Sequence, residues 1–508
     1  MNDYLNKHYN VRVVNVRMKN IPSEERALIL QGGGSLGAYE AGAFDAAYSF
    51  IKYRDAEQKN ADRPIFDIVA GTSIGAINAA ILVSHVVENK TWEGSAERLA
   101  EFWNYISTES LSDKFSDYMT EWWDYWRQFF KDAATGEAVR RYYSSMEFAI
   151  SGAPKVFSPP HTLPDTKFFN VLNNWYRYSN QYLKQSLEQF AKFPIATSYD
   201  NNQPRLILTA VDVMNGNPVV FDSYAKGDGT RKTEYGKYLM NKDNSHDDEN
   251  DDGIGFEHII RYPKGITSDH VLASAAVPVY FDYVPLEVES YNSKTKNYEQ
   301  NTRYFWDGGL LANTPLFELI ILHRQFWYKV KGVKDLLPKL SIALINLHPS
   351  SVDKIPWDYD GVVNRNTDIM FADRSLRDES VILLLSDFVD LSKKLMDVAK
   401  SHGVKKEVID DLLDDRLASH GKLHGIKPMR YRNLIEGQFN IGEVIRIERK
   451  HTEHETSKKI FDFSSNTIKQ LLQNGYDDVV DSLMLRFGHE YLRSAGIKQG
   501  KQGAHALE

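Results

Sequence analysis

The chain has 508 residues, of which 42% are hydrophobic and 26% are charged, values typical of a soluble globular protein rather than a disordered one. Its formal net charge of −8 argues against a nucleic-acid-binding protein, because such proteins are usually basic. The chain contains no cysteine, which excludes disulfides, thiolate nucleophiles, iron–sulfur clusters and cysteine-ligated zinc. At about 150 residues per domain, the length fits three domains or one α/β domain with large insertions.

The N-terminal residues 1–22 are expected to form a loosely attached leader without the apolar core of a secretion signal. Residues 68–87 contain no Asp, Glu, Lys or Arg and have the length of a membrane span. However, the Gly-Thr-Ser-Ile-Gly sequence at 71–75 would break a membrane helix. A buried strand, a tight turn and a buried helix are therefore the better interpretation of this stretch.

Two strand–turn–helix units follow the leader. The first has an apolar strand at 26–31 (RALILQ), a glycine-rich loop at 32–37 (GGGSLG) and a helix at 38–53. The second has a strand at 65–70 (IFDIVA), the turn GTSIG and a helix at 76–88. Short loops between such units predict parallel strand pairing and a right-handed α/β layout.

The rest of the chain has a less regular pattern. Residues 91–200 are rich in aromatic and polar residues and are interpreted as a helical insertion. Further strands are expected at 205–213, 218–223, 303–306 and 340–347. Further helices are expected at 268–276, 374–401 and 465–487.

The clearest chemical signal is Gly71-Thr72-Ser73-Ile74-Gly75, a G-x-S-x-G motif between a buried strand and a helix. A nucleophilic serine must stand clear of its own backbone on a turn too tight for side chains two positions away, which explains Gly71 and Gly75. The dipole of the following helix would favour negative charge near its N-terminus. The alternative is a glycine-rich turn in which Ser73 only caps the helix.

The glycine loop offers a second signal. Consecutive glycines at Gly32, Gly33 and Gly34 leave backbone amides unobstructed, so that they could hold an oxyanion or a phosphate. A dinucleotide loop would need an acidic residue at the end of the next strand, whereas Asp55 and Glu57 fall in a helix end or loop. An oxyanion hole is favoured over a nucleotide loop and over a plain turn.

The base that would activate Ser73 is less obvious. None of the 15 histidines has a recognisable context, although His258, His270 and His348 are candidates. Asp307 follows a strand and precedes two glycines, so it could project from the carboxyl end of that strand, where open α/β sheets place their sites. A carboxylate with a pKa raised by burial could take the serine proton directly. On its own, Asp307 would be an ordinary Asp-Gly turn residue.

The three motifs together resemble the patatin-like phospholipase family, and in particular a bacterial and archaeal branch of it. They occur in the order GGGSLG, GTSIG, DGG, each at a strand end. Further agreement comes from VDVMNGNPVVF at 211–221, ASAAVPVYF at 273–281 and DGGLLANTPL at 307–316. The resemblance covers about 26–325 with the insertion interrupting it, and it is weak over 340–490.

The resemblance implies a serine acyl hydrolase, of phospholipase A type, that cleaves lipid esters through a Ser–Asp dyad without histidine, metal or cofactor. Ser73 would be the nucleophile and Asp307 the base. The backbone amides of Gly32, Gly33, Gly34 and Ile74 would form the oxyanion hole. Many family members carry Arg or Lys where this chain has Leu36, a difference that bears on the preference for anionic head groups.

The resemblance also implies a patatin-like three-layer α/β/α fold with a mainly parallel sheet. The expected divisions are a leader (1–22), a catalytic domain (23–90 and 201–350), a helical insertion that could act as a lid (91–200), a helical C-terminal region (351–495) and a tail left by cloning (496–508). The expected partner is a lipid substrate, with peripheral membrane contact left open and no nucleic acid. The expected location is the cytoplasm, with or without membrane association.

Two further segments have alternative interpretations. The aromatic run at 122–130 is either core of the insertion, which is favoured, or a patch that dips into lipid. The acidic run at 243–252 departs from a calcium-binding EF-hand loop at its glycine and glutamate positions, so a solvated loop is favoured. Two other functions stay open at this point: a non-catalytic lipid-binding scaffold, and a nucleotide-binding protein that uses the glycine loop.

Overall fold

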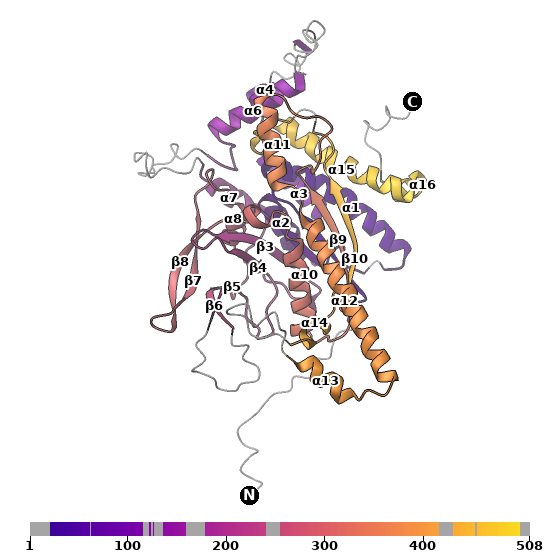
Figure 1. Cartoon of the computed structure of the whole chain (residues 1–508). Helices are drawn as coiled ribbons and strands as arrows, with labels where there is room; N and C mark the ends of the chain where they lie inside the picture. Colours follow the sequence, from indigo (N-terminus) through magenta and orange to yellow (C-terminus); the bar gives the residue numbers. More distant parts are fainter. Residues whose placement is uncertain are drawn as a thin grey trace.

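The computed structural model describes residues 21–60, 62–114, 121–122, 125, 136–158, 178–239, 254–415, 430–452 and 455–497 (Figure 1). Most of the expected leader, most of the aromatic run, the acidic run and most of the tail lie outside the described residues. Of the aromatic run, Trp122 and Tyr125 are described, and both side chains are about half exposed. The choice between insertion core and lipid-facing patch therefore stays a prediction.

The described residues form one mixed sheet of ten strands, with nine in the order β10-β9-β1-β2-β3-β8-β7-β6-β5 and β4 pairing with β3. One half is parallel and contains five strands. These are β1 (Glu24–Leu30), β2 (Ile68–Gly71), β3 (Arg205–Asp212), β9 (Lys339–Asn346) and β10 (Ile441–Glu448). The other half is antiparallel throughout. It consists of β4 (Pro218–Asp222), β5 (Lys232–Leu239), β6 (Ile254–Arg261), β7 (Val284–Asn292) and β8 (Asn297–Asp307).

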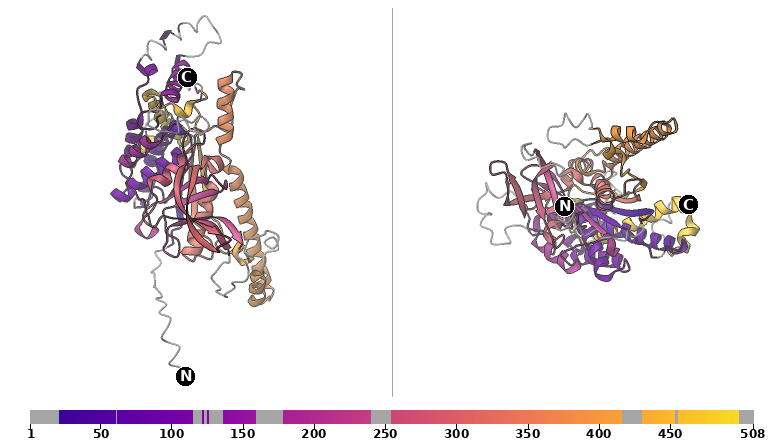
Figure 2. Two further views of the ribbon diagram at one scale, coloured as in Figure 1. Left: turned by 90° about the vertical axis from the view of Figure 1, so that its left-hand side faces the viewer. Right: turned by 90° about the horizontal axis from the view of Figure 1, so that it is seen from below.

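Helices cover both faces of the parallel half. In β1, Leu28 and Leu30 join the core beneath α1 (Gly37–Glu57) and α2 (Ile74–Asn89), while Ala27 and Ile29 join the core on the opposite face. This alternation follows from the two-residue period of a strand and makes β1 apolar on both sides, as a buried parallel strand requires. The opposite face is covered by α10 (Leu316–Arg324) and α12 (Ser375–Ser401). Figure 2 shows the indigo helices and the orange helices on opposite sides of the sheet. The expected three-layer α/β/α fold is thus confirmed.

The remaining helices pack around these layers or extend from them. On the side of α1 and α2 lie α3 (Ser95–Ile106), α7 (Gln181–Phe190), α8 (Ser268–Ala275) and α15 (Ser465–Phe487). The others are α4 (Leu111–Lys114), α6 (Gly136–Ser151), α9 (Gly309–Ala312), α11 (Tyr359–Phe371), α13 (Lys406–Asp414), α14 (Arg432–Ile435) and α16 (His489–Ser494). Short 3-10 turns lie at 34–36, 199–201 and 459–461, and a π-helical turn lies at 325–330.

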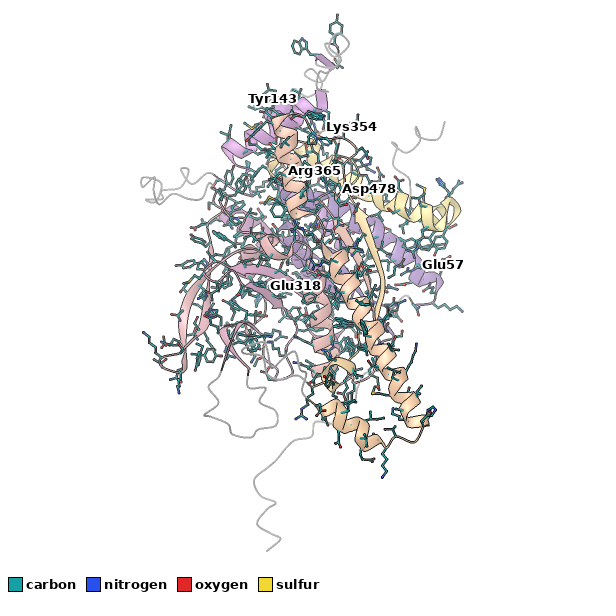
Figure 3. The ribbon with its side chains drawn as sticks, in the orientation of Figure 1. Glu57, Tyr143, Glu318, Lys354, Arg365 and Asp478 are labelled. Atoms are coloured by element: carbon teal, nitrogen blue, oxygen red, sulfur yellow. The ribbon has the colours of Figure 1, made fainter. Side chains whose placement is uncertain are left out.

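The expected strands and helices form with ends shifted by a few residues, and β1 and β2 pair in parallel as predicted. Strands β5, β6, β7 and β10 were not expected. The C-terminal region, expected to be helical, contributes β10 to the central sheet and packs α15 against α1. Tyr39 of α1 donates a hydrogen bond at 2.8 Å to Asp478, which Figure 3 labels on α15. Within the described residues, no helix combines the length and hydropathy that crossing a membrane demands.

Candidate active site

Ser73 stands on a strained turn between β2 and α2. Its backbone has φ 57° and ψ −123°, a conformation that costs a residue with a side chain about 1–3 kcal/mol. The two flanking glycines allow this turn: a Cβ at Gly71 would overlap the carbonyl of Gly75, and a Cβ at Gly75 would overlap the carbonyl of Leu30. The sequence motif therefore reflects close backbone packing, which lifts the serine away from its own strand and places it before the N-terminus of α2.

The glycine loop follows β1 and lies against Ser73. A Cβ at Gly32 would stand 2.9 Å from the Ser73 Cβ. The Gly32 amide already donates to Asn313 Oδ1 at 3.1 Å, so it is not free to bind a ligand. The amides of Gly33, Gly34 and Ile74 have no hydrogen-bond acceptor within the described part of the chain. Of the four donors that the sequence suggested, these three are available.

Asp307 reaches the site from the antiparallel half of the sheet. It ends β8 and pairs with Ala210 of β3, while Gly71 at the end of β2 pairs with Leu208. Two residues beyond Gly71, Ser73 thus reaches the same level of the sheet as Asp307. Asp307 lies at the carboxyl end of a strand, as the sequence predicts, but β8 runs opposite to β3. Strand register, and not a shared strand direction, brings Asp307 to this edge.

Asp307 is 4% exposed, and burial raises the pKa of its carboxyl group to about 7, while interactions with the Ser73 side chain and the Gly309 amide oppose this rise. The Gly309 amide donates to Oδ1 at 2.7 Å. Oδ2 has no well-formed hydrogen bond to any described residue. The Ser73 hydroxyl therefore interacts with the carboxyl group without full hydrogen-bond geometry.

Ser274, near the end of α8, connects the two sides of this site. Its hydroxyl accepts the Ser73 amide at 3.0 Å, and its carbonyl accepts the Gly308 amide at 3.4 Å. The next turn adds a bond from the Asp307 amide to the Ala276 carbonyl at 2.9 Å. Ser274 is fully buried. Its segment, ASAAVPVYF, agrees with the family pattern, but no local motif predicts a role for Ser274, because the contact joins residues 201 positions apart.

Two side-chain amides brace the glycine loop against the loop after Asp307. Asn313 Nδ2 donates to the carbonyls of Gly32 at 3.3 Å and Phe371 at 2.8 Å. Gln31 Nε2 donates to Thr314 Oγ1 at 3.0 Å and to the Phe371 carbonyl at 3.1 Å. Gln31 and Asn313 stand next to the motifs, but the sequence pattern alone predicts no role for either. The bracing fixes the loop amides before any ligand arrives.

The alternative residues from the sequence have structural roles elsewhere. Asp55 lies inside α1 and forms a buried ion pair with Arg26, so it is not placed to bind a ribose at a strand end. His270 of α8 is buried, and its Nδ1 forms a hydrogen bond with Thr267. Burial lowers the pKa of His270 to about 4. His348 Nδ1 bonds to Asp368 at 2.9 Å. No described histidine forms a hydrogen bond with Ser73 or Asp307.

A pocket of about 270 Å³ opens beside the loop that follows Asp307. Its wall includes Gly309 and Asn313 of the site, the exposed side chain of Phe317, and the first turn of α12, but not Ser73. Glu318 of α10 also lies in this wall, and burial raises the pKa of its carboxyl group (Figure 3). The pocket therefore adjoins the Ser73–Asp307 pair from the side of Asp307.

Three comparisons relate the chain to known proteins. Among solved structures, the crystal structure of VipD from Legionella pneumophila matches at 14% identity and a TM-score of 0.30, a score that does not establish a common fold. That match covers 91% of this chain and 67% of the other. No curated protein matches the sequence. The family model described as patatin-like phospholipase matches residues 28–320, more than half of the chain and all three motifs. The chain therefore belongs to the patatin-like phospholipase family.

Proposed function

We propose that this protein hydrolyses acyl esters of lipids, with Ser73 as the nucleophile and Asp307 as the general base. Membership of the family supports a lipid acyl hydrolase in general. The observation that carries the residue assignment is the pair itself: a serine held at φ 57° interacts with a buried aspartate whose pKa is about 7. A base with a pKa near the working pH is half deprotonated and still basic enough to take a proton.

In the acylation step, Ser73 Oγ attacks the ester carbonyl carbon while Asp307 takes the hydroxyl proton. The amides of Gly33, Gly34 and Ile74 would hold the oxyanion of the tetrahedral intermediate, with the N-terminus of α2 adding a favourable dipole. Losing one such donor typically costs about 3 kcal/mol of barrier. Asp307 then protonates the departing alcohol as the carbon–oxygen bond breaks.

In the deacylation step, Asp307 takes a proton from water as its oxygen attacks the acyl carbon, and then gives that proton to Ser73 Oγ as the acyl–serine bond breaks, which releases the fatty acid and regenerates the enzyme. Both reacting side chains are less than 10% exposed, so the site is shielded from bulk water, which strengthens the electrostatic stabilisation. These residues need no metal or cofactor for either step. The phospholipase A specificity, and the placement of the oxyanion, belong to the proposal.

The test is hydrolysis of p-nitrophenyl butyrate and of a lipid panel containing phosphatidylcholine, lysophosphatidylcholine and diacylglycerol. Wild type should release fatty acid from at least one lipid. Ser73→Ala should reduce turnover to background, while Ser293→Ala, which changes an exposed serine of the β7–β8 turn, should keep full activity. Turnover that survives in a folded Ser73→Ala protein would refute the assignment. A folded wild type with no ester turnover would favour a non-catalytic scaffold.

A further inference from the structure

Helix α12 has two apolar faces, and only one of them packs against the body of the protein. The inner face places Ile382 in the core with α10. Polar residues continue this contact, since Gln438 donates to Asp390 at 2.6 Å and accepts from Lys393 at 2.6 Å. At 27 residues, α12 is about 40 Å long, and Figure 2 shows it at the periphery, away from α1.

The outer face carries an apolar row with a regular period. Six side chains, each between 49% and 60% exposed, follow one another at alternating spacings of three and four residues. They are Val381, Leu384, Phe388, Leu391, Leu395 and Val398. A single exposed leucine is ordinary, whereas a 3–4 repeat over 18 residues is the pattern that meets another helix in a coiled coil.

The charges beside this row indicate which helix fits. Asp387 and Lys394 flank the row on the same side, both are exposed, and neither forms an ion pair with a described residue. If a second copy of α12 lies antiparallel, Val381 faces Val398, Leu384 faces Leu395, and Phe388 faces Leu391. Asp387 of each copy then lies beside Lys394 of the other, which gives two ion pairs related by the two-fold axis.

A parallel pairing of the same helix has no such complementarity. In register, Asp387 would face Ser392 of the second copy, and Lys394 would face Ala399. A lipid surface is also less suited, because membrane-surface helices are rich in Lys and Arg, whereas α12 contains five acidic and four basic residues. The row is therefore best matched by another copy of itself, running in the opposite direction.

We propose that two copies of this chain associate through α12, which forms an antiparallel two-stranded coiled coil along its outer face. The dimer is two-fold symmetric, with Phe388 and Leu391 at its centre. The first turn of α12 also lines the pocket beside Asp307, through Ser375 and Asp378. The paired row begins at Val381, one turn beyond this pocket wall. This inference is independent of the hydrolase assignment.

Sedimentation equilibrium of the full chain tests the association. Wild type should have twice the mass of one chain at micromolar concentration. Leu391→Glu should be a monomer with unchanged circular dichroism, because it buries a charge at the centre of the coiled coil. Leu485→Glu, at an equally apolar but unrelated exposed position, should remain a dimer. A monomeric wild type, or a dimer that survives Leu391→Glu, would overturn the proposal.

Charge reversal tests the direction of pairing. Asp387→Lys or Lys394→Asp alone creates two like-charge contacts and should raise the dimer dissociation constant about tenfold. The double variant restores opposite charges and should return the constant to near the wild-type value. Equal effects of the single and double variants would contradict the antiparallel arrangement.

Because the chain has no cysteine, any disulfide formed on oxidation must join introduced cysteines, and it therefore shows which positions are neighbours in the dimer. An equimolar mixture of Val381→Cys and Val398→Cys proteins should yield mixed disulfide dimers, whereas each variant alone should remain uncrosslinked. Crosslinking of each variant with itself would show parallel pairing and refute the model. Binding of a monomeric wild type to phosphatidylcholine–phosphatidylglycerol vesicles, lost in Leu391→Glu, would instead assign the face to lipid.

Discussion

The two halves of the sheet contribute the two members of the candidate dyad in different ways. In the parallel half, Ser73 is positioned by the five consecutive residues 71–75, which connect the end of β2 to the start of α2. In the antiparallel half, Asp307 is positioned by the register between β8 and β3, strands more than 80 residues apart in sequence. The geometry of the nucleophile is therefore local, whereas the geometry of the base depends on long-range pairing. We therefore expect substitutions near Ser73 to act through the local turn, and substitutions in β8 to act through strand pairing.

The register of β8 has its own anchor. Arg303 donates to both oxygens of the fully buried Asp212, at 2.6 and 2.8 Å, and Tyr235 donates to the same carboxylate at 2.7 Å. Although burial acts to raise the pKa of Asp212, the hydrogen bonds from Arg303 and Tyr235 leave it below its ordinary value. This ion pair lies four residues before Asp307 and ties β8 to the end of β3. In the antiparallel half, this ion pair fixes the position of Asp307, as the tight turn fixes the position of Ser73 in the parallel half.

The largest expected effect comes from removing the base. Asp307→Asn keeps the shape of the side chain but cannot accept the Ser73 proton, so kcat should fall about 10³-fold. Ester hydrolysis by the folded variant measures this loss. Asp335→Asn, on an exposed loop, serves as the control and should retain wild-type kcat. An Asp307→Asn enzyme with near-normal kcat would show that another group takes the proton.

Removing the Arg303–Asp212 ion pair should lower the free energy of unfolding and should affect the reaction only as a consequence. Arg303→Met leaves Asp212 buried without its cation and should lower the free energy of unfolding by about 3–5 kcal/mol. The matched control is Arg261→Met, whose partner Glu289 lies in a more exposed ion pair in the same half of the sheet, and its loss should cost under about 1 kcal/mol. Urea unfolding measures both. Similar losses of unfolding free energy in the two variants would show that the buried Asp212–Arg303 ion pair stabilises the sheet no more than an exposed pair does.

The local turn should be sensitive to a single methyl group. Gly75→Ala places a Cβ against the Leu30 carbonyl, and relieving this overlap should cost about 2–3 kcal/mol and displace Ser73. Gly227→Ala meets only a distant Val330 methyl group and should leave both stability and activity unchanged. Thermal unfolding and ester hydrolysis would be compared for the pair. A fully active, stable Gly75→Ala protein would contradict the close packing.

The pKa of Asp307 makes both activity and stability depend on pH. As the base protonates below about pH 7, kcat/KM should fall about tenfold per pH unit. Between pH 3.8 and 7 the folded state holds a proton that the unfolded chain releases, so the free energy of unfolding falls as the pH rises.

At pH 8, Asp307→Asn should therefore be more stable than wild type, by up to about 4 kcal/mol. Urea unfolding at pH 4 and pH 8 checks this difference, which should shrink at the lower pH. An equal or lower stability at pH 8 would argue against the raised pKa.

The smallest effect is expected from the link between the two halves. Ser274→Ala removes the acceptor of the Ser73 amide, so kcat should fall about tenfold while KM changes little. Ser268→Ala in the same helix removes a hydrogen bond to Glu188, remote from the site, and should leave kcat intact. Steady-state kinetics of the two variants separate a positioning role from a general weakening of α8.

The same local and long-range division explains what the sequence could predict. Ser73 and the glycine loop were identified because each lies in a short motif at the end of a buried strand, where spacing alone fixes the geometry. Asp307 is predicted from its place between a strand and two glycines together with the family resemblance, but neither indicates that β8 runs opposite to β3. The role of Ser274 was missed because its contact depends on packing between distant segments. β10 was missed because a half-exposed edge strand has a weak apolar alternation.

The most direct measurement of the central claim is fluorophosphonate labelling of the full chain followed by peptide mass spectrometry. The proposed mechanism predicts one modified residue, Ser73, with labelling slowed in Asp307→Asn and absent in Ser73→Ala. Modification of a different serine that tracks with ester hydrolysis, or full hydrolytic activity in unlabelled Ser73→Ala, would contradict it.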